Sequence, residues 1–126
     1  MTPEEKKERV RELRLKKLFN ISAAEYNAIS YCQGDCCAIC RLPASTFKTR
    51  LAIDHDHKTG LIRGLLCSMC NRAIAKFRDN AEKLQSAANY LKSPPATIAL
   101  GGERYGLKGR VTNKAATRKR LNKIKT

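Results

Sequence analysis

Two short stretches, Cys37-Ala-Ile-Cys40 and Cys67-Ser-Met-Cys70, decide how this chain of 126 residues can fold. Each C-x-x-C pair suits a tight turn that presents two thiolates to one tetrahedral Zn²⁺, and 26 residues separate the two pairs. A hairpin between the pairs would bring the turns together. We therefore predict a structural Zn²⁺ site on the four cysteines; buried free thiols or a redox pair are the alternative.

Two further cysteines, Cys32 and Cys36, precede the first pair. Cys36 and Cys37 are adjacent and cannot both point into one turn, and Cys37 gives the two-residue spacing. Cys32 and Cys36 are then spare thiols, unless they form a second metal site or one of them replaces Cys37. Four thiolates leave no coordination position for water, so catalysis would have to occur elsewhere.

The segment between the cysteine pairs has the pattern of a β-hairpin. Residues 50–54 and 61–66 are short apolar-rich runs, and Lys58-Thr59-Gly60 lies between them as a turn. After Cys70 the pattern becomes helical. The sequence therefore predicts two strands and a helix closed by zinc, which would supply folding energy to a chain with no Trp and 6% aromatic residues.

Helices are expected on both sides of this core. Residues 3–18 form a solvent-facing helix with Val10, Leu13 and Leu18 at helical spacing. The capping-box pattern Ser22-Ala-Ala-Glu25 precedes a short helix that carries Tyr26 and Ile29 and ends near Gly34. Asp79-Asn-Ala-Glu82 repeats the capping pattern before a helix with an apolar face and a stop at two prolines; the face consists of Ala81, Leu84, Ala88 and Leu91, and the prolines are Pro94 and Pro95.

The charge of the chain predicts a polyanionic partner. Lys and Arg number 26 against 11 Asp and Glu, for a formal charge of +15. Residues 93–126 alone hold 9 basic residues and 1 acidic residue. We predict that this segment is a flexible DNA-binding arm, helical near 111–125 when bound, in which phosphate contacts come from Lys108, Arg110, Lys114, Arg118, Lys119 and Arg120. A solvated tail is the alternative.

Both histidines of the chain lie in Asp54-His55-Asp56-His57, between the cysteine pairs. Carboxylate and amide oxygens suit a hard cation such as Mg²⁺, and Asn71 offers an amide oxygen directly after Cys70. A neutral imidazole beside the cation can take a proton from water. In a regular strand, the two aspartates would share one face and the two histidines the other. The alternative is a polar loop in a zinc module.

Taken together, these motifs resemble the recombination endonuclease VII family, a branch of the His-Me or HNH (ββα-metal) nucleases. The resemblance rests on both cysteine pairs, on Leu51-Ala-Ile-Asp54-His55-Asp56-His57, on Leu61-Ile-Arg63-Gly64-Leu65-Leu66-Cys67 and on Cys70-Asn71, and it covers about residues 18–91. It implies a small α+β fold, with an HNH-like ββα-metal core, a four-cysteine zinc site and flanking helices.

The resemblance also implies roles for individual residues. Zn²⁺ would lie on the cysteine quartet and a catalytic Mg²⁺, replaceable by Mn²⁺ or Ca²⁺, on Asp54 and Asn71. His55 would be the general base and His57 a supporting catalytic residue. Arg63 would face phosphate or form a salt bridge with Asp56. The charge of the chain, rather than the resemblance, makes Arg72 a further candidate for DNA binding. The chain departs from the family at Arg41 and Ala75, where glycine is common.

These expectations define a metal-dependent DNA endonuclease with three parts. Residues 1–36 are N-terminal helices packed on the core, 37–92 are the nuclease core and its following helix, and 93–126 are the arm. The expected partner is duplex DNA or branched DNA such as a Holliday junction. The chain would act on it as a junction resolvase or as a nicking or homing-type enzyme. Paired cuts in a junction would suit a homodimer. The absence of an apolar span or signal peptide predicts an intracellular protein, and a phage-encoded enzyme acting in its host fits the family. A non-catalytic zinc module that binds nucleic acid remains the alternative.

Overall fold

The computed structural model describes residues 1–107 and divides the chain into two compact units between Leu84 and Gln85. The boundaries expected at 36/37 and 92/93 stay predictions. The part of the arm expected to be helical, 111–125, lies outside the described residues, as do the six basic residues expected to contact phosphate, which are Lys108, Arg110, Lys114, Arg118, Lys119 and Arg120. Within residues 1–107, no helix has the length and apolar character needed to cross a membrane.

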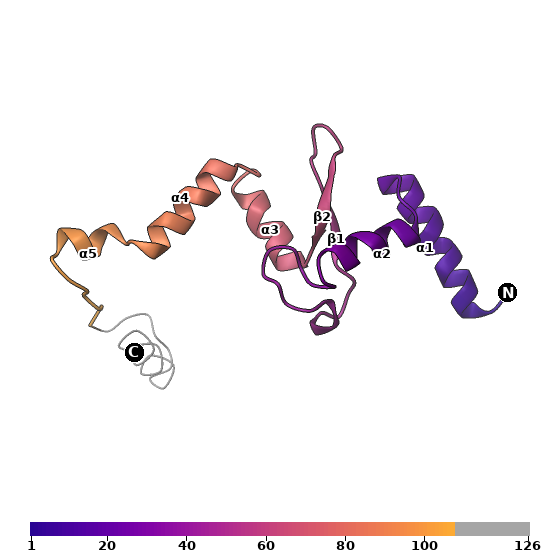
Figure 1. Ribbon diagram of the computed structural model, residues 1–126, viewed down its shortest axis with the longest axis horizontal. Coiled ribbons are helices and arrows are strands. Elements are labelled where there is room, and N and C mark those ends of the chain that lie inside the picture. Colours follow the sequence, from indigo (N-terminus) through magenta and orange to yellow (C-terminus); the bar gives the residue numbers. More distant parts are fainter. Residues whose placement is uncertain (108–126) are drawn as a thin grey trace. The chain divides into compact units, whose positions relative to one another are not determined.

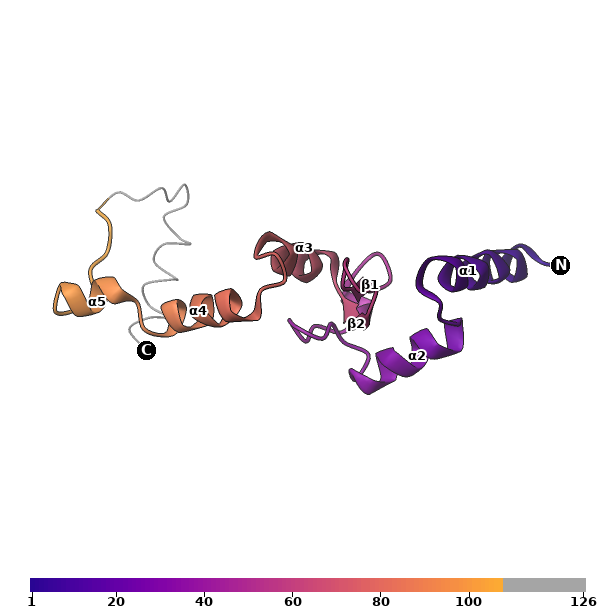
Figure 2. The same cartoon turned by 90° about the horizontal axis from the view of Figure 1, so that it is seen from above.

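The first unit is a small α+β fold, as expected (Figure 1). Its two antiparallel strands lie between helix α3 on one side and helices α1 and α2 on the other, in both views (Figures 1 and 2). In chain order the elements are α1 (Pro3–Phe19), α2 (Ala23–Cys32), the 3-10 turn η1 (Ala44–Thr46), β1 (Ala52–His55), β2 (Ile62–Leu66) and α3 (Ser68–Lys76). The order β1-β2-α3 between the cysteine pairs and beyond is the predicted one.

Side-chain caps fix where the first two helices begin. The hydroxyl of Ser22 accepts a hydrogen bond from the Glu25 amide at 3.0 Å, and the Glu25 carboxylate accepts one from the Ser22 amide at 2.8 Å. This reciprocal pair is the predicted capping box. Thr2 and Glu5 form the same motif at the start of α1. A carboxylate oxygen of Glu12 on α1 then accepts from the Ala23 amide at 3.0 Å, which joins α1 to the start of α2.

Helix α1 faces solvent along most of its surface, as expected, and packs through a face that does not carry its periodic apolar residues. Val10 and Leu13 are 64% and 61% exposed, whereas Leu15 is buried and Phe19 is partly buried against the core. The buried face therefore runs along the opposite side of the helix. Few large apolar side chains of α1 point toward the core, so hydrogen bonds such as the one from Ala23 to Glu12 help to hold α1 in place.

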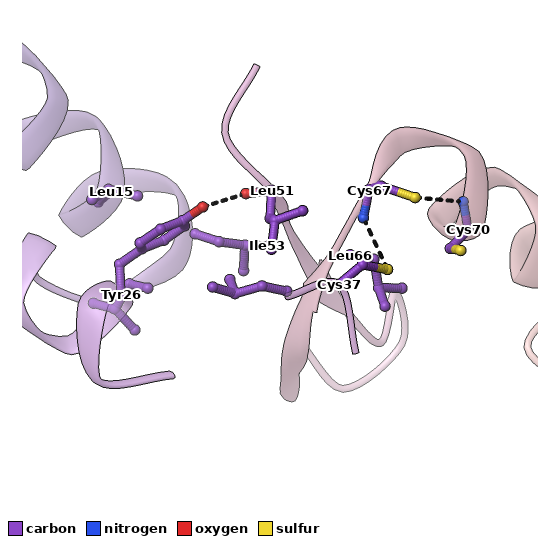
Figure 3. Close-up of a cluster of buried hydrophobic side chains, with 10 residues drawn as sticks. Leu15, Tyr26, Cys37, Leu51, Ile53, Leu66, Cys67 and Cys70 are labelled. Atoms are coloured by element: carbon purple, nitrogen blue, oxygen red, sulfur yellow. Dashed lines mark hydrogen bonds between the residues drawn. The ribbon is translucent and has the colours of Figure 1, made fainter. Parts of the chain in front are cut away.

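The core is small, and the cysteines form part of it. Tyr26 lies in its interior and donates a 2.6 Å hydrogen bond to the carbonyl oxygen of Leu51 (Figure 3). The buried apolar residues are Leu15, Ile21, Tyr26, Cys37, Leu51, Ile53, Leu65, Leu66, Cys67 and Cys70. Since three members of the cysteine quartet are among them, the zinc-site cysteines and the apolar core are a single structural feature.

The hairpin contains a bulge near its turn. Asp54 pairs with Gly64, but the next residue, His55, pairs with Ile62, so the register skips Arg63. A bulge of this kind bends the strand and re-aims the adjacent side chains. The strict alternation of faces expected for Asp54 to His57 therefore ends at His55, which is also the last residue of β1.

Helix α4 (Ala81–Lys92) begins one residue later than its sequence pattern suggested. Asn80, not Asp79, is the capping side chain, because its carboxamide oxygen accepts from the Lys83 amide at 2.9 Å. Both Arg78 and Asp79 have positive φ, near 54° and 55°, so the chain turns sharply before the helix. After Pro94, a further short helix, α5 (Pro95–Ala99), was not predicted.

Candidate metal centre and active site

The four predicted zinc ligands meet in space. The sulfur atoms of Cys37, Cys40, Cys67 and Cys70 all lie within 4.8 Å of one another. Four thiolates bound to Zn²⁺ at about 2.3 Å would lie about 3.8 Å apart at the corners of a tetrahedron, and the Sγ atoms of Cys40 and Cys67 are 4.0 Å apart. The donor set, its number and its spacing fit a closed structural zinc site.

Backbone N–H groups join the two cysteine turns and order the second one. The amide of Cys67 donates to Cys37 Sγ at 3.4 Å, and the amide of Cys70 donates to Cys67 Sγ at 3.4 Å (Figure 3). The amide of Ala38 donates to the carbonyl oxygen of Leu65 at 3.2 Å, which couples the first turn to β2. The cluster is therefore tied to the hairpin by the main chain as well as by the sulfur atoms.

The thiols of this cluster have opposite tendencies to ionise. Burial opposes ionisation of Cys37, but N–H donation from Cys67 and Cys40 outweighs it and lowers the pKa of the Cys37 thiol to about 6. Burial and the neighbouring thiols raise the pKa of Cys70 to about 12. The cluster thus accommodates one negative charge readily and resists further ones, and a bound dication would balance them.

Cys32 and Cys36 lie outside the quartet. Cys32 is exposed, and the thiol of Cys36 donates to the carbonyl oxygen of Gly34 at 3.2 Å. Among residues 1–107, the quartet is the only group of three or more Cys, His, Asp or Glu side chains close enough to share an ion. The choice of Cys37 over Cys36 therefore agrees with the geometry.

Gln33 is a residue that sequence reasoning did not single out for a role. Its carboxamide donates to the carbonyl oxygens of Cys36 and Leu65 at 2.9 Å each, and accepts from the Leu65 amide at 2.8 Å. The side chain thus pairs with the outer edge of β2 as a neighbouring strand would. A Cβ on Gly64 would lie 3.0 Å from the Gln33 oxygen, so glycine leaves room there for the close approach of the carboxamide. Gln33 connects α2, the first cysteine turn and β2.

Asp54 is a buried carboxylate held by two N–H groups of one arginine. Its side chain is 9% exposed, and Arg63 donates from Nε at 2.7 Å and from Nη2 at 2.9 Å. The same Nη2 lies 3.3 Å from a carboxylate oxygen of Asp79. Arg63 is thus paired with Asp54 and Asp79, rather than with the Asp56 partner considered from the sequence. These carboxylates raise the pKa of Arg63 above its usual range.

Asp56 has a local structural role. Its carboxylate accepts from the amides of Lys58 and Thr59 at 2.8 and 3.0 Å, which closes the hairpin turn. These two N–H groups lower the pKa of the Asp56 carboxyl. Both amides donate to the same oxygen, Oδ1, and the ion pairs of Arg63 among residues 1–107 are with Asp54 and Asp79 instead.

The two histidines lie next to each other at the end of β1. The ring centroids of His55 and His57 are 4.9 Å apart, and the ring of Phe19, the last residue of α1, meets the His55 ring edge-on at 5.7 Å. His55 is partly buried and His57 is exposed. Phe19 thus gives His55 an apolar neighbour on one side while leaving the imidazole accessible.

Asn71 lies in the first turn of α3, whose N-cap is Cys67. It is partly buried, and within residues 1–107 its carboxamide makes no side-chain hydrogen bond, including any to Asp54. Ile74, one turn further on the same face of α3, lines a hollow of about 270 Å³ together with Asp54 and Arg63. Arg72 is exposed and donates to the carbonyl oxygen of Ser68 at 3.3 Å.

The two departures from the family pattern have different structural settings. Arg41 has φ 65°, a left-handed conformation that explains why glycine is favoured directly after the second cysteine. Ala75 lies within α3, where alanine is a good helix former. Only the Arg41 position carries a backbone cost.

Comparison with known proteins places the chain in a family. A profile for recombination endonuclease VII matches residues 12–93, which include the cysteine quartet, the hairpin and α3. The gene 59 protein of Mycobacterium phage D29 is 48% identical over 91 residues, 71% of this chain and 54% of that protein. The gene 59 protein of Mycobacterium phage L5 is 44% identical over 91 residues, 71% of this chain and 55% of that protein.

The chain spans about half the length of these phage relatives. No solved structure matches it. The profile match covers the residues that build the metal cluster and the hairpin, so the family assignment rests on the same segment as the geometry. The chain belongs to the recombination endonuclease VII family.

Proposed function

We propose that the chain is a metal-dependent endonuclease that hydrolyses phosphodiester bonds in DNA, with its active site at the end of β1 and the start of α3. The observation that carries this proposal is that a chain of the endonuclease VII family has a zinc-type cysteine cluster and, in the hairpin attached to it, the Asp54–His57 segment. The formal charge of +15 supports DNA as the substrate.

In this proposal His55 is the general base. Its imidazole takes a proton from a water molecule, and the resulting hydroxide attacks phosphorus in line with the leaving 3′-oxygen. The bond between phosphorus and the 3′-oxygen breaks, and the leaving oxygen takes a proton from solvent water, which gives 5′-phosphate and 3′-hydroxyl ends. The edge of Phe19 limits the positions that the imidazole can take, and His57, whose ring is 4.9 Å away, is a supporting residue near the phosphate.

Asp54 and Asn71 would hold one Mg²⁺, which supplies charge neutralisation at the phosphate and at the leaving oxygen. The donor chemistry fits. Each carboxylate oxygen of Asp54 accepts one N–H from Arg63 and retains a lone pair. Arg63 fixes the orientation of this carboxylate, and the zinc cluster fixes the start of α3 that carries Asn71.

A plasmid-nicking assay tests the proposal. The zinc-loaded chain should nick supercoiled DNA when Mg²⁺ is added, and His55→Ala should abolish nicking while zinc content and DNA binding stay unchanged. Cys32→Ser, which alters an exposed thiol outside the cluster, serves as the matched control and should cut normally. If His55→Ala cut as fast as the parent, the role of His55 would be wrong. Binding without Mg²⁺-dependent cutting by the parent would favour a non-catalytic zinc module.

The form of the DNA substrate requires a second comparison. We propose branched DNA as a substrate, because the family is named for recombination. Resolution of a four-way junction needs two coordinated cuts, and hence a homodimer. Rates on a synthetic junction and on linear duplex, with the mass of the protein in solution, distinguish a resolving dimer from a monomer that nicks duplex DNA.

A further inference from the structure

A basic groove lies between α1 and β1 in the first unit. It has a volume of about 730 Å³, and α1, the segment before β1 and β1 itself form its walls. We define the α1–β1 groove by its four cationic residues, Lys7, Arg11, Arg14 and Arg50. Among the residues that the structure describes, no acidic side chain lines it. The role proposed for the site at His55 uses none of these residues.

The spacing of the cations along α1 suits a nucleic-acid strand. Lys7, Arg11 and Arg14 follow one another at intervals of four and three residues, so they share one face of the helix. They extend over about 10 Å at 1.5 Å per residue. Successive phosphates of one DNA strand rise by about 3.4 Å along the duplex axis, so about three of them span the same length.

Arg11 has a hydrogen-bonding group that the protein does not satisfy. Its guanidinium lies 5.0 Å from the centre of the Tyr26 ring, and Nη1 is 3.6 Å from a carboxylate oxygen of Glu8. The other terminal nitrogen, Nη2, is buried and has no hydrogen-bond partner among residues 1–107. Buried donors in proteins nearly always have an acceptor. Rotation of the guanidinium toward the groove would bring this nitrogen to a phosphate oxygen.

Glu8 is the acid nearest to these cations. Its two carboxylate oxygens lie 3.6 Å from Arg11 and from Arg50, and its side chain is 60% exposed. The Arg11 side chain is 17% exposed, but contacts of this length to an exposed carboxylate are weak. A phosphate that enters the groove can therefore replace Glu8 at both arginines.

One end of the groove reaches the proposed catalytic residues. Phe19 and Ile53 line the groove, Phe19 contacts the His55 ring at 5.7 Å, and Ile53 is two residues from His55 on β1. A strand bound along α1 would thus continue to the end of β1. Lys7 and Arg11 precede residue 12, where the match to the family profile begins.

We propose that the α1–β1 groove binds the sugar–phosphate backbone of the DNA strand that leads to His55, by contacts to phosphate and without reading bases. This inference rests on the proposed nuclease function for the direction of the strand. The binding itself does not depend on cleavage and can be measured without Mg²⁺.

Two double variants of the zinc-loaded full chain test the groove. Lys7→Gln/Arg14→Gln removes one Lys and one Arg from the groove face of α1. Arg9→Gln/Lys16→Gln removes the same residue types from the opposite face of the same helix. Both lower the net charge by two. Fluorescence anisotropy with a labelled DNA duplex in EDTA, repeated from low to moderate salt and with two unrelated sequences, gives the affinity and its salt dependence.

We expect the groove variant to bind at least about tenfold more weakly at low salt, equally on both sequences, and to reduce the slope of log K against log salt by about 2. The control should keep the parent slope. Glu8→Gln should strengthen binding more than Glu4→Gln, which removes an exposed carboxylate elsewhere on α1. Equal losses in the two double variants would overturn the proposal, because net charge alone would then explain binding.

The same variants separate this inference from the proposed function. Weaker binding of the groove variant, in a protein that never cuts DNA, would support the groove and reject the nuclease. Normal cutting and normal binding by Lys7→Gln/Arg14→Gln would reject the groove and leave the nuclease standing. A sequence-dependent loss would contradict pure backbone contact.

Discussion

Replacement of Gln33 should destabilise the fold more than its partly exposed position suggests. Gln33→Ala removes three hydrogen bonds of 2.8 to 2.9 Å and leaves the amide of the fully buried Leu65 without its acceptor. At a net value of about 1 kcal/mol for each bond, the free energy of unfolding should fall by about 3 kcal/mol. Urea unfolding of the zinc-saturated chain, followed by far-UV circular dichroism, measures this loss.

A matched glutamine provides the control. Gln85 is exposed on α4 and makes one side-chain bond, to Asn89, so Gln85→Ala should change stability by less than about 0.5 kcal/mol. Gly64→Ala should also destabilise, by about 1–2 kcal/mol, because the new Cβ would lie 3.0 Å from the Gln33 oxygen.

The two changes at Gln33 and Gly64 form a double-mutant cycle. In the Gln33→Ala background the added Cβ meets no carboxamide, so Gly64→Ala should lose most of its cost there. A coupling energy near zero would refute the reasoning, as would a Gln33→Ala variant as stable as Gln85→Ala. Either result would mean that the edge of β2 does not depend on this side chain.

Other contacts give predictions of their own. Tyr26→Phe removes the 2.6 Å bond to Leu51 and should cost about 1–2 kcal/mol by thermal unfolding; an unchanged Tm would contradict it. Burial raises the pKa of Tyr26 in the folded state. The stabilisation that Tyr26 provides is therefore fully present below pH 10.0, the pKa in the unfolded chain, and is lost as the pH rises through the pKa in the folded chain. Above pH 10 the parent should lose more stability than the Tyr26→Phe variant. Arg63→Lys replaces a two-point contact on Asp54 with a point charge and should cost about 1–3 kcal/mol, discounted for partial exposure, in urea; a loss no larger than that of Arg72→Lys would argue against it. Elemental analysis should find one zinc ion per chain, and its chelation should abolish cooperative unfolding by circular dichroism; a chain that still unfolds cooperatively after complete zinc removal would show that the cluster is not structural.

Local patterns in the sequence predicted the parts of this fold that local contacts determine. The C-x-x-C spacing places two sulfur atoms in one turn regardless of the rest of the chain, and the Ser22 to Glu25 box is satisfied within four residues. The same holds for the hairpin, whose turn is closed by Asp56 and the two amides that follow closely. These predictions were correct because the residues that contact each other are close in sequence.

Contacts between distant residues were not predictable from such patterns. Gln33 and Leu65 are 32 positions apart, and nothing in either segment indicates that a carboxamide will act as a strand partner. The buried face of α1 was not predicted for the same reason, since the periodic apolar residues are exposed and Leu15 meets a core that only the tertiary fold creates. Asp79 matched a cap pattern, but its pairing with Arg63 leaves the cap to Asn80.

The bulge at Arg63 shows why the candidate site itself is the hardest part to derive. A regular strand would place Asp54 and His55 on opposite faces, and a sequence pattern can say no more than that. The register instead skips Arg63, which lets this residue reach Asp54 and Asp79 while β1 ends at His55. Cys67 directly follows β2, so the cysteine cluster adjoins the end of the hairpin opposite to the bulge. Deletion of Arg63 removes the bulge, so it should change the relative orientation of the Asp54 and His55 side chains more than any single side-chain replacement. The four cysteines lie outside β1 and the turn, and they should still bind one zinc ion.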